Sequence, residues 1–163
     1  MANPKNRLIR NLTRVVCGVR GINNQAGYKD HYKRISSLLE STSERYQRGS
    51  NAFGATLWLL GIDKSDNPHK IAPQLMEDFL YENCEEVRER EASIVAFRSL
   101  IPVHDNSLSS LEHTGLYVPK NEMVLHQPYI GMRYIAQKLS DILKTDDLKN
   151  PEFYAPKKLT FKI

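Results

Sequence analysis

Cysteine and long apolar runs are scarce in this 163-residue sequence, and each scarcity excludes a class of protein. Cys17 and Cys84 are too few for the disulfide framework of a small secreted domain, so we expect two reduced, buried thiols. The longest apolar stretch, 55–60, is far shorter than the roughly 20 residues of a membrane-spanning helix. Polar residues also interrupt the apolar positions near the N-terminus, so no signal-peptide core forms. These absences favour a soluble cytoplasmic protein that makes no membrane contact.

Sequence motifs that specify a reaction, a metal or a cofactor are also missing. The histidines lack the HxxxH and HExxH spacings and no CxxC pair occurs, which argues against a structural zinc site. Gly49 and Gly54 lack the Lys-Ser/Thr that completes a phosphate-binding loop, and there is no nucleophile elbow. We therefore expect no cofactor and no metal, and the sequence favours a non-enzymatic role.

What the sequence contains instead is a regular spacing of apolar residues at steps of three and four, the period of an amphipathic helix. This period predicts basic helices within 5–48, core helices within 50–101 and a last helix at 129–145. Residues 102–128 lose the period and carry several prolines, so we expect an irregular excursion there.

The predicted fold is mainly α, a single-domain helical bundle of about five helices that extends over residues 1–148. With 40% hydrophobic residues, a chain of this length can bury a core of its own. The segment 53–60 is apolar on all sides and is expected in that core. Residues 149–163 form a basic C-terminal tail, whose composition would let it either dock as a strand or remain free.

Charged residues are sorted by position along the chain. Residues 1–48 contain ten Lys or Arg against three Asp or Glu, whereas residues 71–91 contain two against seven. Residues 149–163 are basic again, with four against one. Two basic ends therefore flank an acidic centre, and clustered cations raise the local potential in a way that favours a polyanionic partner.

The predicted first helix places its arginines on the side opposite its apolar residues. Guanidinium groups in a row can each bind a phosphate through two hydrogen bonds, and the lysines of the second helix extend the row. We therefore interpret the protein as an accessory subunit of a larger nucleoprotein assembly that contacts the backbone of DNA or RNA. The candidate nucleic-acid-binding residues are Arg7, Arg10, Arg14, Arg20, Lys29 and Lys33.

The acidic centre supports a second hypothesis, a protein-interaction or inhibitor module that binds a basic partner through an acidic face at 77–91. The same face could pair with the basic face of another copy and form a homo-oligomer. No second element supplies further ligands, so a partner-facing surface is favoured over a magnesium site. The candidate partner-binding residues, expected on one side of a long helix or of the first of two helices joined near Glu91, are Glu82, Glu85, Glu86 and Glu89.

A third hypothesis rests on Arg98 and His104, an arginine followed after a short gap by a histidine. This spacing resembles that of the helical ribonucleases of the HEPN superfamily. The resemblance implies that this chain is a helical protein that cleaves RNA. It covers these few residues alone, and Pro102 lies between them. A pair at this distance is also expected by chance in a chain with this many arginines and histidines.

Overall fold

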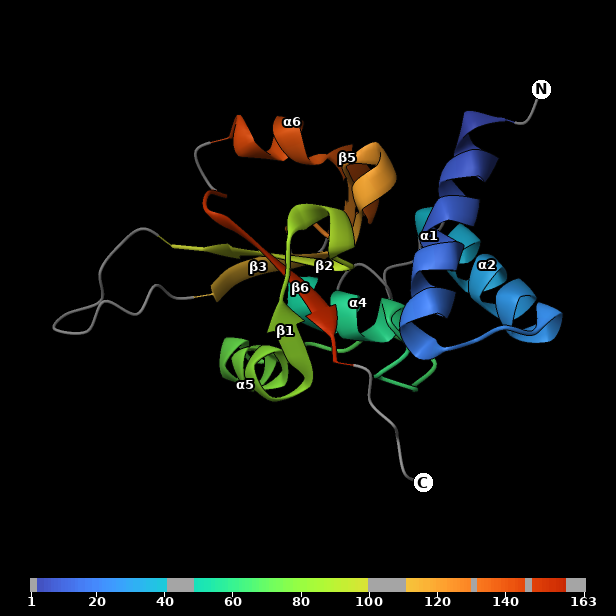
Figure 1. Cartoon of the computed structure of the whole chain (residues 1–163), viewed down its shortest axis with the longest axis horizontal. Helices are drawn as coiled ribbons and strands as arrows, with labels where there is room; N and C mark the ends of the chain where they lie inside the picture. Colours follow the sequence, from blue (N-terminus) through green and yellow to red (C-terminus); the bar gives the residue numbers. More distant parts are fainter. Residues whose placement is uncertain (1–2, 41–48, 100–110, 130–131, 146–147, 158–163) are drawn as a thin grey trace, which may run out of the picture.

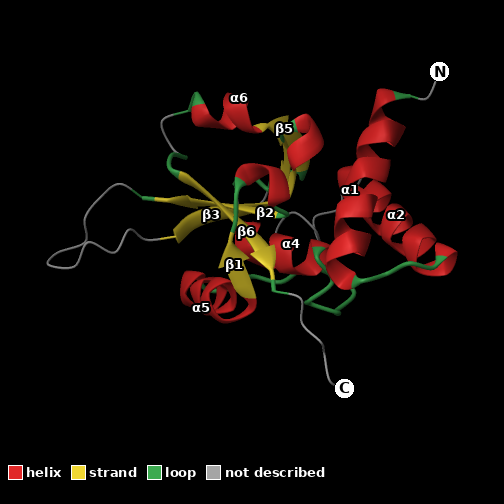
Figure 2. Cartoon of the chain, in the orientation of Figure 1, coloured by secondary structure: helices red, strands yellow, loops and turns green. Residues whose placement is uncertain are grey.

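Helices dominate the first half of the described chain and an antiparallel sheet dominates the second half (Figure 1). The computed structural model describes residues 3–40, 49–99, 111–129, 132–145 and 148–157. None of the helices in these ranges is long and apolar enough to cross a membrane. Figure 2 distinguishes the helices from the strands. The elements follow in the order α1 (Pro4–Arg20), α2 (Gln25–Glu40), α4 (Ala52–Leu59), α5 (Pro73–Asn83), β1 (Cys84–Glu86), η1 (Glu89–Glu91), β2 (Ile94–Arg98), β3 (Leu111–Val118), η2 (Pro119–Asn121), β4 (Met123–His126), β5 (Ile135–Lys138), α6 (Leu139–Leu143) and β6 (Pro151–Pro156).

The sheet has six strands in the order β1-β6-β2-β3-β4-β5, and every neighbouring pair is antiparallel. The last strand along the chain, β6, therefore lies inside the sheet rather than at its edge. Tyr154 of β6 pairs with Glu86 of β1 on one side and with Ile94 of β2 on the other. Of the two outcomes expected for the C-terminal tail, docking as a strand is the one observed for residues 151–156.

The two faces of the sheet bury separate apolar clusters, because successive side chains of a strand point to opposite sides. Ile94 and Leu116 belong to the larger cluster, which also contains residues of α1, α2, α4 and α5. Val95 and Tyr117 belong to the smaller cluster, together with Ile142 of α6. Figure 1 shows α6 on one side of the sheet and α4 and α5 on the other.

Local signals account for both ends of α1. Asn3 Oδ1 accepts a hydrogen bond from Lys5 N at 3.0 Å, and Pro4 occupies the first helical position, where an N–H would have no helical partner. Gly21 ends the helix at φ 65°, a left-handed conformation that glycine adopts without strain. The basic helix expected at the start of the chain is confirmed.

Helix α4 lies at the centre of the larger cluster, and the prediction that the segment 53–60 is buried is confirmed. Asn51 caps this helix, with its Oδ1 accepting hydrogen bonds from Gly54 N at 3.0 Å and Ile71 N at 3.1 Å. Its Nδ2 donates to Ile71 O at 2.8 Å. One amide side chain thus fixes the loop that follows α4 against the start of the same helix.

The expectation of a mainly α bundle is wrong, because the chain forms strands beyond Asn83. Core helices were expected to continue to residue 101, but Ile94–Arg98 is strand β2. The last helix expected at 129–145 is instead β5 followed by the short α6. Within the expected irregular excursion, the described residues 111–126 hold strands β3 and β4.

Periodicity misleads at these positions for a physical reason. A strand buried on both faces reads as an unbroken apolar run, and a short run matches the helical pattern as well as the strand pattern. Strand β2 is such a run, since every residue in it except Arg98 is buried. No glycine or proline between Pro73 and Pro102 marks the change from helix to strand.

We expect Gly54→Ala to lower the free energy of unfolding by about 3 kcal/mol or more. A Cβ atom there would lie 1.5 Å from the backbone oxygen of His69, which cannot move aside as a flexible side chain would. Gly18→Ala is the matched control in α1, where a Cβ meets nothing within 4 Å and higher helix propensity should stabilise by about 0.5–1 kcal/mol. Urea unfolding followed by circular dichroism measures both, and equal midpoints would contradict the buried contact.

Candidate functional site

The arginines of α1 lie on its solvent-facing side. Arg7, Arg10 and Arg14 are exposed, whereas Leu12 and Val16 on the opposite side are fully buried. The separation follows from the helical period, which places residues three, four and seven apart on one face. The row of three guanidinium groups predicted from the sequence is therefore present on the surface.

Helix α2 repeats this arrangement beside α1. Lys29 and Lys33, one turn apart, are exposed, whereas Ile35 and Leu38 are buried. The two helices pack against each other, and Figure 1 shows them side by side at the same end of the molecule. Five of the exposed cations of α1 and α2 are named together the basic helix surface, namely Arg7, Arg10, Arg14, Lys29 and Lys33.

The protein's own carboxylates leave the basic helix surface available. Within the described part of the chain, none of its five cations enters an ion pair. The ion pair that does join the two helices is Lys5 Nζ to Glu40 Oε1, at 3.2 Å between two half-exposed side chains. A polyanion approaching α1 and α2 would therefore meet cations that form no ion pair with a carboxylate of the described residues.

Arg20, the sixth predicted cation, serves a structural contact instead. Its Nη1 lies 2.7 Å from Nε2 of His31, and because a guanidinium can only donate, the imidazole accepts and is neutral. Burial lowers the pKa of His31, and the charges of Arg20 and Arg34 lower it further. A Cβ on Gly61 would lie 2.7 Å from the Arg20 guanidinium, so this side chain lies over the end of α4.

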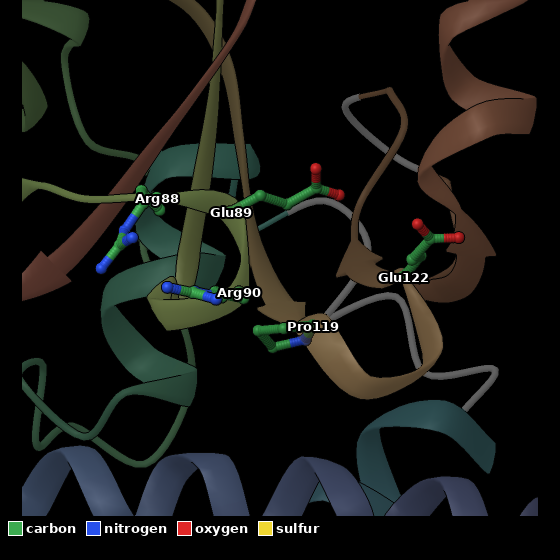
Figure 3. Close-up of a pocket in the computed structure, with 5 residues that line it drawn as sticks. All are labelled: Arg88, Glu89, Arg90, Pro119 and Glu122. Atoms are coloured by element: carbon green, nitrogen blue, oxygen red, sulfur yellow. The ribbon is translucent and has the colours of Figure 1, made fainter.

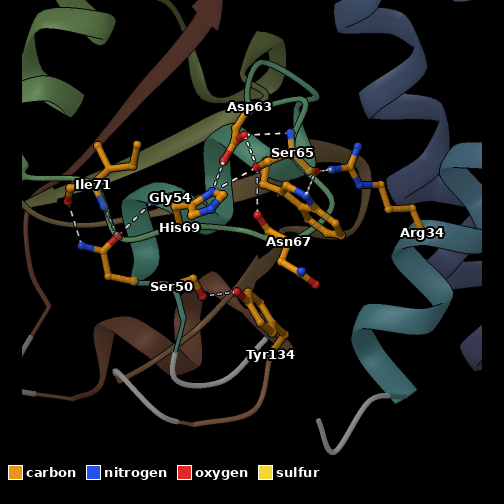
Figure 4. Close-up of polar contacts among 11 residues, drawn as sticks. Arg34, Ser50, Gly54, Asp63, Ser65, Asn67, His69, Ile71 and Tyr134 are labelled. Carbon is orange, nitrogen blue, oxygen red and sulfur yellow. Dashed lines mark hydrogen bonds and ion pairs between the residues drawn. The ribbon is translucent and has the colours of Figure 1, made fainter. Parts of the chain in front are cut away.

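A second arginine fixes α2 to the core. The guanidinium of Arg34 lies over the ring of Trp58, 3.7 Å from its centroid, and Nη2 donates to Ser65 O at 3.1 Å. Trp58 Nε1 donates to the same carbonyl oxygen at 2.9 Å (Figure 4). The orientation of the basic helix surface is thus tied to the buried helix α4.

The loop beneath this contact gathers Asp63, Ser65 and His69, which sequence reasoning did not identify. His69 Nδ1 lies 3.0 Å from Ser65 Oγ and 3.3 Å from Asp63 Oδ2 (Figure 4). A proton relay needs one imidazole nitrogen for the hydroxyl and the other for the carboxylate, but here Nδ1 contacts both. Burial acts to raise the pKa of Asp63, yet the hydrogen bonds from Ser65 and His69 outweigh it and lower the pKa. This cluster orders the loop.

The predicted acidic residues do not share one helical face. Glu82 lies in α5, Glu85 and Glu86 lie in β1, and Glu89 lies in η1. All four are exposed, and Glu89 Oε1 accepts a hydrogen bond from the hydroxyl of Tyr117 at 2.5 Å. The four glutamates therefore lie on three successive elements and not on one face of a helix.

Arg98 ends strand β2 rather than lying in a helix, and its guanidinium is occupied. Nη2 donates to Glu77 Oε2 at 2.9 Å and Nε donates to Glu152 Oε2 at 2.7 Å. The hydrogen bonds with Glu77, and then those with Glu152, raise the pKa of Arg98 above its usual range despite burial. His104, the other half of the ribonuclease hypothesis, lies outside the described residues.

A buried histidine pair is a second polar feature that the sequence did not reveal. His126 Nε2 donates to Gln137 Oε1 at 3.2 Å, so its Nδ1 accepts from His113 Nε2 at 2.7 Å. The pair occupies adjacent strands on the face of the smaller cluster, with exposed fractions of 4% and 3%. Burial lowers the pKa of both histidines, and for His113 the neighbouring His126 lowers it further. Thirteen residues separate them, so only strand pairing brings them together.

No group of three or more metal-ligating side chains lies among the described residues. Comparison with known proteins finds no matching family model, no matching curated protein and no matching solved structure. The geometry of these sites therefore carries the functional argument.

We expect the buried histidine pair to lower the free energy of unfolding in acid. Unfolded histidine titrates near 6.5, whereas the folded pair stays neutral to a lower pH, so the unfolded chain binds protons first. The free energy of unfolding should therefore be constant above about pH 6.5. It should decrease as the pH falls below about 6.5, by at most about 1.4 kcal/mol per pH unit for each buried histidine. Urea unfolding between about pH 7.5 and about pH 5 measures the slope.

Two variants assign this slope to the pair. His126→Gln should flatten the pH dependence, because one titrating ring is removed. Val124→Ala, a truncation in the same strand, should lower stability equally at every pH and keep the slope. If His126→Gln retained the full slope, the neutral buried pair would not be its source.

Proposed function

We propose that the protein is a non-enzymatic accessory subunit that binds the backbone of DNA or RNA through the basic helix surface. The observation that carries the proposal is the presence of five exposed cations, unpaired within the described chain, on the outer sides of two packed helices. Backbone phosphates attract such groups without any sequence preference.

The dimensions of α1 support contact with more than one phosphate. Arg7 and Arg14 are about 10 Å apart along the helix axis at a rise of 1.5 Å per residue. Duplex nucleic acid presents a charge about every 1.7 Å along its axis, so three guanidinium groups can meet several phosphates at once. Each contact releases condensed counterions, and binding of this kind weakens steeply as salt is added.

The cytoplasm is the compartment that we propose. Cys17 and Cys84 are both free and buried, as expected of a protein that folds in a reducing compartment. Burial raises the pKa of both thiols, to about 12 for Cys84, which keeps them protonated and unreactive. The two buried thiols thus fit the proposed non-enzymatic role, in which neither cysteine reacts.

Charge reversal of the helix surface tests the proposal. The combined change Arg7→Glu and Arg10→Glu should weaken binding of the full chain to a labelled single strand and to a duplex. It should also lower the slope of log affinity against log salt by about 1 for each lost phosphate contact. Fluorescence anisotropy between about 50 and 200 mM salt measures affinity and slope together.

The matched control reverses two exposed lysines that lie outside α1 and α2. Lys138→Glu with Lys144→Glu changes the net charge equally, at the start and end of α6, and should leave binding nearly unchanged. Equal losses in the two double variants would mean that net charge, not the helix surface, attracts the polyanion. Undetectable binding at low salt would reject the proposal.

A further inference from the structure

An open pocket with a volume of about 500 Å³ lies between the two short helices η1 and η2. Its lining residues are Arg88, Glu89, Arg90, Pro119 and Glu122 (Figure 3). Four of the five lining side chains are charged, with both signs represented, so the pocket suits a polar ligand that itself carries both charges.

The carboxylate of Glu89 is held by a tyrosine, and the backbone of Glu122 is fixed by hydrogen bonds. Glu89 Oε1 accepts a hydrogen bond from the hydroxyl of the fully buried Tyr117 at 2.5 Å, which leaves Oε2 for another partner. Both backbone polar groups of Glu122 are hydrogen-bonded. Its N donates to Pro119 O at 3.2 Å, and its O accepts from Leu139 N at 2.8 Å. Figure 3 shows the side chain of Glu89 extending toward the side on which Glu122 lies.

The hydroxyl of Tyr117 is bonded to Glu89, one of the two carboxylates that line the pocket. Burial raises the pKa of this hydroxyl, and the bond to Glu89 and the charges of Glu89 and Glu122 raise it further. Two carboxylates that act on one buried hydroxyl create a negative potential between them. A cation placed there would relieve their repulsion.

The two arginines of the pocket differ in availability. Arg88 Nη2 pairs with Glu91 Oε1 at 3.4 Å, and Figure 3 shows its guanidinium directed away from both glutamates. Arg90 enters no ion pair within the described chain, and it lines the pocket together with Pro119. Arg90 is thus the group that can receive an anion.

We propose that this pocket binds an arginine with a free carboxylate, whose guanidinium lies between Glu89 and Glu122 and whose carboxylate contacts Arg90. A guanidinium is preferred to an ammonium because its planar donors can bond two carboxylates at once. Free arginine and a peptide that ends in arginine share this chemistry. The site is separate from the basic helix surface, so it can be tested independently of nucleic-acid binding.

Four probes test the ligand on the full chain by isothermal titration calorimetry. L-arginine should bind, argininamide should bind more weakly because it lacks the carboxylate, and citrulline should not bind because its side chain is uncharged. N-acetyl-arginine distinguishes the two sources: binding comparable to arginine supports a peptide C-terminus, and loss of binding relative to arginine supports the free amino acid. No binding of any probe, or citrulline binding as tightly as arginine, would overturn the proposal.

Two variants test the placement of the ligand. Glu122→Gln removes one carboxylate charge from an exposed turn and should weaken arginine binding about tenfold. Arg90→Ala should weaken arginine binding by a similar factor but leave argininamide binding unchanged. Lys120→Ala removes an exposed neighbouring cation of η2 that does not line the pocket, and it should change neither. If Arg90→Ala affected arginine and argininamide equally, the carboxylate contact would be refuted.

Discussion

The position of strand β6 inside the sheet is the constraint on which the second half of the fold depends. β6 pairs with β1 on one side and β2 on the other, so among the described strands β1 joins the sheet only through it, whereas the preceding α5 also contacts β3. Glu152 of β6 also accepts a hydrogen bond from Nε of Arg98. Pairing the end of the chain with its middle gives contacts of long sequence separation, which close late and slowly in folding.

Arginine occupies three different environments in this protein, and the differences decide which arginines can serve a partner. Arg98 is held by two carboxylates, and Arg34 is stacked on Trp58. Both contact other groups of the protein, so replacing either would remove a contact that connects two parts of the fold. The arginines of the basic helix surface have no such duty within the described chain. Positive charge alone therefore overstates the binding surface, and only contacts separate structural cations from available ones.

Titratable side chains divide in the same way between the interior and the surface of the sheet. The pair of His113 and His126 is closed to solvent, so its protonation acts on stability and not on a ligand. The charged side chains between η1 and η2 face an open pocket, so they can act on molecules from solution. Tyr117 joins these regions, since its ring lies in the smaller cluster and its hydroxyl supports Glu89.

The sequence by itself determined the two basic amphipathic helices, their exposed cations and the burial of α4. These features depend on periodicity and capping within a few residues, which the chain carries locally. The tertiary structure decided the sheet, the histidine pair, the partners of Arg98 and the pocket. Short apolar runs adopt helix or strand according to what they pack against, and these groups meet only when distant strands pair. Such pairing leaves no mark at any single position in the sequence.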